Sequence, residues 1–187
     1  SIDEECEFYK KLSEELISLN FENSKVNKTS NTRFESIQET KEKVKTIRVE
    51  GFENLDNLFD EITEDQPSDI FNFFKVLSKH LIQINAYLKN EDLDFETALY
   101  TLTSEMMEEL KDFDISQRKY IYKGIASQIN YKSSKYEYIS SEDSDFVDIK
   151  YHEIVEGNGQ RIKRGLSFIL LEKATNKVMR YGKVKVG

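Results

Sequence analysis

The first 19 positions carry apolar residues at three- and four-residue steps, with glutamate and lysine between them. This spacing places the apolar side chains on one face and predicts an N-terminal helix within residues 1–21. Asparagine, serine, threonine and charged residues dominate residues 22–42. Ordering a backbone costs about 1–2 kcal/mol per residue, and this stretch has few apolar side chains to offset it, so we expect a mobile segment there. A short strand is expected at Lys43–Val49, within a main domain over residues 43–187.

The helical spacing returns after Pro67, a residue type that suits the first turn of a helix. A wide apolar stripe follows, and two shorter stretches repeat the pattern. The sequence thus predicts three helices, at about 68–88, 95–111 and 116–129. Asp94 and Ser116 precede the second and third of these helices, and we expect their side-chain oxygens to cap them.

Beyond residue 145 the apolar spacing falls to two, which is the period of a β-strand. Gly157–Gln160 interrupts the pattern with a glycine-rich turn of the kind that joins hairpin strands. We therefore expect three antiparallel strands in a meander over about 146–186. Arg161–Glu172 should be the central strand, because its middle is apolar on both faces. The side chains expected to face the helices from it are those of Leu166, Phe168 and Leu170.

These elements predict an α+β fold class, in which an N-terminal layer of three or four helices packs on a C-terminal three-stranded antiparallel meander. The chain has 187 residues with one proline and seven glycines, which argues against a loop-rich β-sandwich. One such domain, with an added N-terminal helix, accounts for the whole length.

Charge is divided unevenly along the chain. Residues 1–114 contain 13 Lys and Arg against 27 Asp and Glu, whereas residues 115–187 contain 14 against 8. Glu172 is the single acidic residue after Gln160, where eight basic residues occur. Such asymmetry indicates an anionic partner, either outside the protein or within its own acidic half.

The basic meander is the first candidate site. Lysine and arginine neutralise phosphates, and tyrosine rings stack on unpaired bases, so a basic sheet with tyrosine suits a nucleic acid or another anion. Two other interpretations stay open: a solvated sheet face with lysines that prevent edge pairing, and internal pairing with the acidic helices. The candidate residues are Arg161, Lys163, Arg164, Lys177, Arg180, Tyr181, Lys183 and Lys185.

Asp148-Ile149-Lys150 is a second candidate. A carboxylate and a lysine two residues apart on a strand share one face, as in metal-dependent nucleases of the PD-(D/E)xK type. Three upstream acids, Glu137, Asp143 and Asp145, are available as further ligands. The expected meander lacks the helix and parallel strand that normally follow this motif, so Asp148 and Lys150 are kept only as candidate catalytic residues.

The remaining signals concern location and cofactors. Cys6 is the only cysteine, which precludes an internal disulfide and a multi-cysteine zinc site and favours a reducing, cytoplasmic location. No apolar run approaches the roughly 20 residues of a membrane span, and no secretory signal opens the sequence. No glycine-rich phosphate loop is present either, so we expect no cofactor and no bound metal.

The leading interpretation is a non-enzymatic, intracellular binding or regulatory protein. It would act through contacts with a protein partner or a second copy of itself, and its basic C-terminal sheet would meet an anionic partner. The first alternative is a nucleic-acid-binding protein that uses the basic, tyrosine-containing meander. The second is a metal-dependent nuclease.

Overall fold

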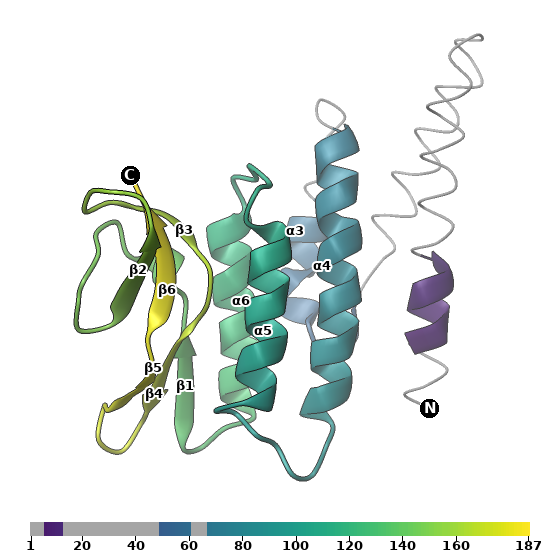
Figure 1. Ribbon diagram of the computed structural model, residues 1–187. Helices are drawn as coiled ribbons and strands as arrows, with labels where there is room; N and C mark the ends of the chain where they lie inside the picture. Colours follow the sequence, from purple (N-terminus) through teal and green to yellow (C-terminus); the bar gives the residue numbers. More distant parts are fainter. Residues whose placement is uncertain (1–5, 13–48, 61–66) are drawn as a thin grey trace, which may run out of the picture. The chain divides into compact units, whose positions relative to one another are not determined.

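The computed structural model describes residues 6–12, 49–60 and 67–187 (Figure 1). Residues 6–12 are helical, as expected for that part of the chain. The rest of the expected N-terminal helix, the polar segment 22–42 and nearly all of the expected strand Lys43–Val49 lie outside the described residues. The chain divides into two compact units, and the boundary falls between Ile82 and Gln83, inside helix α4 (Pro67–Leu88).

In the first unit, the short helices η1 (Glu53–Leu55) and α3 (Asp56–Asp60) precede α4. The rings of Phe59 and Phe74 lie 5.0 Å apart and contribute to a core of aromatic and leucine side chains. The other buried members of this core include Phe52, Leu55, Phe73, Leu77 and Leu81. The start of α4 at Pro67 confirms the expected proline position.

The second unit contains the end of α4 and the helices α5 (Ala98–Leu110) and α6 (Arg118–Tyr131). The expected cap at Asp94 is confirmed, because its carboxylate accepts hydrogen bonds from the backbone N–H groups of Thr97 (3.0 Å), Ala98 (3.3 Å) and Glu96 (3.1 Å). These bonds, that of Thr97 above all, lower the pKa of Asp94. The regular helix begins later than expected because residues 95–97 form a turn under this cap.

The expected cap at Ser116 is wrong. Its hydroxyl donates to the Gln117 side chain (3.0 Å) instead of accepting from a backbone N–H. A backbone acceptor replaces the expected side-chain cap: the Arg118 N–H donates to the Ile115 carbonyl (3.2 Å) in a turn that leads into α6. Gln117 takes the N-cap position, and its side chain makes no capping hydrogen bond to the backbone of α6.

Two sheets of three strands follow the helices. The first has the antiparallel order β1 (Tyr136–Ile139), β4 (Ile169–Glu172), β5 (Val178–Arg180). The second has the order β2 (His152–Glu156), β6 (Gly182–Val186), β3 (Ile162–Gly165), with β2 parallel and β3 antiparallel to β6. A 3₁₀ turn, η2 (Ser141–Asp143), precedes β2.

The fold class is thus α+β, but the expected single meander is wrong. The expected central strand Arg161–Glu172 is cut at Leu166–Phe168 into β3 and β4, which join different sheets. The expected last strand is likewise cut at Tyr181 into β5 and β6. Ser167 explains the position of the first break, because its buried hydroxyl accepts a hydrogen bond from the Lys183 N–H (2.9 Å). This bond joins the segment between β3 and β4 to the start of β6, next to the second break.

The chain bends at Gly157–Gln160, but the expected hairpin is wrong, because the strands β2 and β3 on either side do not pair with each other. Gly157 and Gly159 have φ values of 92° and 131°, as the glycine-rich pattern predicted. The turn carries the chain across the end of β6, so close that a Cβ on Gly157 would lie 2.0 Å from the Val186 carbonyl oxygen. Strand β6 therefore occupies the place between β2 and β3.

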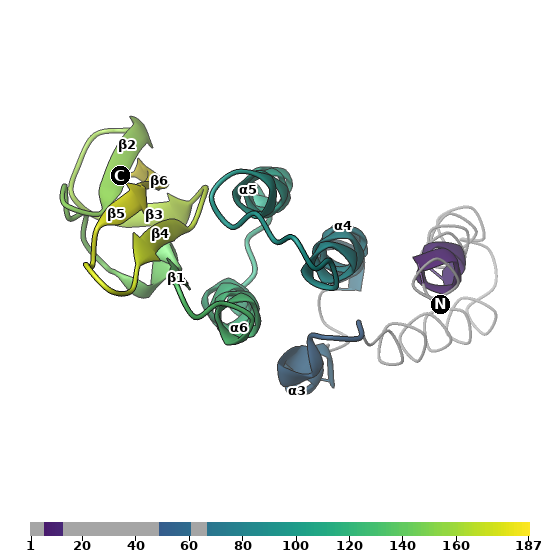
Figure 2. The same cartoon turned by 90° about the horizontal axis from the view of Figure 1, so that it is seen from below.

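Within this unit, α5 and α6 lie on one side of the sheets (Figure 2). Phe168 is fully buried, with ring centroids 6.2 Å from Tyr122 of α6 and 5.8 Å from Tyr138 of β1. Leu170 is buried as expected, whereas Leu166 stays half-buried because it lies in the break between strands. No helix of the described residues is long and apolar enough to cross a membrane.

Candidate functional site

The eight residues of the expected basic site are divided between the two sheets. Arg161, Lys163 and Arg164 lie at or in β3, and Lys183 and Lys185 lie in β6 of the same sheet. Lys177, Arg180 and Tyr181 instead lie at or next to β5, which belongs to the other sheet. The break at Tyr181 thus separates basic residues that the sequence placed on one continuous strand.

Four basic side chains line one cleft of about 500 Å³, which we call the cationic cleft. Lys111 comes from the C-cap of α5, Lys163 and Arg164 from β3, and Lys185 from β6. Asp112 and Glu156 complete the lining. The end of α5 and the strands β3 and β6 therefore supply the four cations, and the two carboxylates come from the end of α5 and from β2.

The cations of the cationic cleft differ in how their charge is balanced. Lys185 Nζ lies 3.2 Å from the Glu156 carboxylate, and Lys111 pairs with Glu108 one turn earlier in α5, a bond that raises the pKa of Lys111. Lys163 and Arg164 form no ion pair with any residue in the described parts of the chain. Among the described residues, these two side chains are therefore the cations of the cleft without a paired carboxylate.

Two other basic residues of the expected site contact aromatic rings. The Arg161 guanidinium lies 5.1 Å from the centre of the Phe146 ring, and that of Arg180 lies 5.3 Å from the Tyr100 ring. Both distances suit cation–π attraction. Lys177 is exposed in the turn between β4 and β5, and the Tyr181 side chain is half-exposed beside the β5–β6 break.

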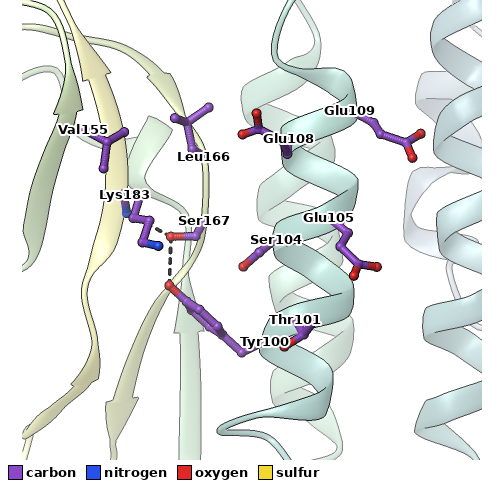
Figure 3. Close-up of a pocket in the computed structure, with 10 residues that line it drawn as sticks. All are labelled: Tyr100, Thr101, Ser104, Glu105, Glu108, Glu109, Val155, Leu166, Ser167 and Lys183. Atoms are coloured by element: carbon purple, nitrogen blue, oxygen red, sulfur yellow. Dashed lines mark hydrogen bonds between the residues drawn. The ribbon is translucent and has the colours of Figure 1, made fainter.

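Lys183 lies in a second depression, the α5 groove, of about 610 Å³ (Figure 3). Tyr100, Ser104 and Glu108 of α5 point from one side toward Lys183, Leu166 and Val155 on the other. The Tyr100 hydroxyl donates to Ser167 Oγ (2.9 Å) and closes one end of the groove. The α5 groove is mixed in character, with hydroxyl, apolar and charged groups.

Asp148 and Lys150 do not lie on a strand, so the expected strand placement is wrong. Residues 148–151 form a turn that leads into β2. The Asp148 carboxylate accepts the Lys150 backbone N–H (2.9 Å), an Asx turn that explains this pair of residues in structural terms. The Lys150 ammonium lies 5.3 Å from the Tyr151 ring centre. Across residues 6–12, 49–60 and 67–187, no three His, Cys, Asp or Glu residues are grouped so that they could hold a metal ion.

His152 anchors the same turn from the first position of β2. Its Nδ1 accepts the Asp148 backbone N–H (3.0 Å), which leaves the proton of the neutral ring on Nε2. Burial lowers the pKa of His152 and keeps the imidazole neutral near pH 7.

Lys111 is the member of the cationic cleft that the sequence did not indicate. Its neighbours in the sequence are mostly acidic, so the net charge of this stretch is negative; they include Glu108, Glu109, Asp112 and Asp114. Its place opposite β3 and β6 depends on how α5 packs on the sheet, which no local pattern encodes. Arg118 is the reverse case: it belongs to a basic and aromatic stretch but is buried, where it donates to the Tyr122 hydroxyl (3.0 Å).

Comparisons with known proteins add no family to this description. No family model matches the chain, and no curated protein or solved structure matches it. The geometry of the cationic cleft and of the sheet around it is therefore what bears on function.

Proposed function

We propose that this is a binding protein whose cationic cleft receives an anionic group of a protein partner. The observation that carries the proposal is the convergence of Lys111, Lys163, Arg164 and Lys185 from three elements. Lys163 and Arg164 have no ion-pair partner among the described residues, so their charge is available. An arginine next to a lysine suits a carboxylate or phosphate, because the guanidinium offers paired donors and the ammonium a compact charge.

The size and charge of the cleft favour a compact anion. Its two carboxylates would repel a long polyanion, so the mixed lining suits a short acidic group better. Internal pairing accounts for part of the basic sheet, since Lys185 pairs with Glu156. That acid belongs to β2, however, and not to the acidic helical half.

Nucleic-acid binding is the competing proposal. The half-exposed Tyr181 ring beside Arg180 and Lys183 supports it, because such a ring can stack on an unpaired base. The division of the basic residues between two sheets argues against it, since a polynucleotide needs a continuous positive surface. The two proposals therefore depend on different residues.

A titration with an acidic phosphopeptide tests the cleft. The variant Lys163→Gln/Arg164→Gln should weaken binding of a fluorescein-labelled phosphoserine peptide at least tenfold in anisotropy measurements. Lys119→Gln/Lys123→Gln is the matched control, because it removes the same charge from exposed positions of α6 and should leave affinity within twofold.

Equal losses in both variants would mean attraction by net charge alone and would refute the cleft. A labelled single-stranded oligonucleotide provides the other comparison. If it binds more tightly than the peptide, with steep salt dependence and a loss on Tyr181→Ala, nucleic-acid binding replaces the present proposal.

A further inference from the structure

We propose that the outer edge of β2 binds an extended strand of a protein partner in which apolar and basic side chains alternate. This surface differs from the cationic cleft in charge and shares only Glu156 with its lining. The partner segment would pair with β2, which is an edge strand, and would add a fourth strand to the sheet β2-β6-β3.

The two edge strands of this sheet, β2 and β3, differ in whether their outer backbone groups are hydrogen-bonded. The outer side of β3 is covered by the preceding chain: the Ile162 N–H bonds the Asp145 carbonyl (3.0 Å), and the Gly165 N–H bonds the Glu142 carboxylate (3.1 Å). On the outer side of β2, no hydrogen bond joins the backbone of Glu153–Glu156 to another described residue. One edge is closed and the other is open for pairing.

The open edge also exposes apolar side chains on both faces of the sheet. Ile154 and Val155 are each 46% exposed. Ile154 lies opposite Val184, on the buried face, whereas Val155 lines the α5 groove on the opposite face. A partner that packs on one face of the sheet would cover only one of these two side chains. A strand added beside β2 places its own side chains on both faces and would cover Ile154 and Val155 together.

The inner edge of β2 shows which chemistry suits its side chains. Strand β6 has the sequence Gly-Lys-Val-Lys-Val, and its register sets Lys183 opposite Glu153 and Val184 opposite Ile154. Lys185 lies opposite Glu156 and pairs with it. A partner strand of the same basic and apolar alternation would meet the same glutamates from the outer side.

The same charges disfavour a second copy of this chain as the occupant. Residues 142–156 contain six acidic residues and one lysine, so two β2 edges would place like charges opposite each other. The basic edge strand β3 of another copy is already covered. A bulge between Ile154 and Glu156 also limits regular pairing to a few residues, which suits a short segment of another protein.

A peptide with the β6 pattern provides the probe. Labelled Met-Arg-Tyr-Gly-Lys-Val-Lys-Val, the sequence of residues 179–186, should bind the intact protein, and replacing both of its lysines by glutamate should abolish binding. The variant Ile154→Ser/Val155→Ser should weaken peptide binding at least tenfold. Tyr131→Ser is the control, because it removes a large exposed side chain from the end of α6 and should leave binding unchanged.

Sheet addition has its own readout. N-methylation of alternate peptide amides blocks one hydrogen-bonding edge, so of the two alternately methylated peptides one should bind and the other should not. Equal binding by both methylated peptides would overturn strand addition. Sedimentation that shows a dimer lost on Ile154→Ser/Val155→Ser would make a second copy the occupant and would overturn the basic partner. Neither outcome depends on Lys163 or Arg164, so the cationic cleft succeeds or fails separately.

Discussion

At the scale of single residues, His152 shows how a turn fixes the start of β2. Its ring accepts the Asp148 N–H at Nδ1, and its buried Nε2 has no hydrogen-bond partner in the described part of the chain. Protonation would place a second N–H at Nδ1, where the ring now accepts, and would bring a charge into a buried position. The neutral ring is therefore part of the folded structure.

The stability of the protein should decrease as the pH falls through about 6.5, the ordinary pKa of histidine. Because burial lowers the pKa of His152, the unfolded chain binds its proton first, and stability is lost between that pH and the lower folded-state pKa. Urea unfolding at pH 7.5 and 5.5 measures the loss. The variant His152→Gln should show a smaller decrease, and equal decreases would show that other groups are responsible.

At the scale of elements, the sequence predicted the helices of the second unit closely, but it did not predict how the strands pair. A period of 3.6 identifies a helix from its own residues, so α5 and α6 were predicted within a few positions. A period of two identifies a strand but not its partner. The parallel pairing of β2 with β6 and the breaks at Leu166–Phe168 and Tyr181 depend on contacts between distant residues.

The break between β3 and β4 has one local signal in the sequence: Ser167 is the one polar residue in the apolar run Leu166–Leu171. Its hydroxyl binds both the Lys183 N–H and Tyr100, so Ser167→Val should destabilise the protein by about 1–3 kcal/mol by leaving that N–H without its partner. Tyr100→Phe removes the hydroxyl that bonds Ser167 and, at 3.2 Å, the Tyr181 carbonyl, but it leaves the Lys183 N–H paired with Ser167 and should cost about 0.5–1.5 kcal/mol. Chemical denaturation of both variants makes the comparison. A larger loss for Tyr100→Phe would mean that the Lys183 N–H finds another acceptor.

The candidate site was predicted in part for the same reason. Lys163, Arg164 and Lys185 were identified by their charge, but their grouping with Lys111 depends on the position of α5. Val155 and Ile154 read as ordinary strand residues, and their exposure becomes evident only because β2 ends a sheet.

At the scale of the whole molecule, a buried charged group joins helix and sheet in the second unit. Arg118 of α6 is 2% exposed, donates to the Phe113 carbonyl and lies 3.9 Å from the Glu142 carboxylate, which binds the β3 backbone. Removing one partner of a buried pair leaves the other charge uncompensated.

Arg118→Met alone should therefore cost about 3–5 kcal/mol of stability, whereas Arg118→Met/Glu142→Gln should recover part of the loss. Thermal or urea unfolding of both variants, with Glu142→Gln alone as the third corner of the cycle, measures the coupling. Additive losses would show that the two side chains act independently.

The central place of β6 also has a consequence for synthesis. Strands β2 and β3 leave the ribosome before β6, yet β6 is the neighbour that both of them share in the sheet. Until β6 emerges, the growing chain carries two unpaired strands, and the apolar side chains of Ile154 and Val155 lie on one of them. We therefore expect the nascent protein to be prone to aggregation during this interval.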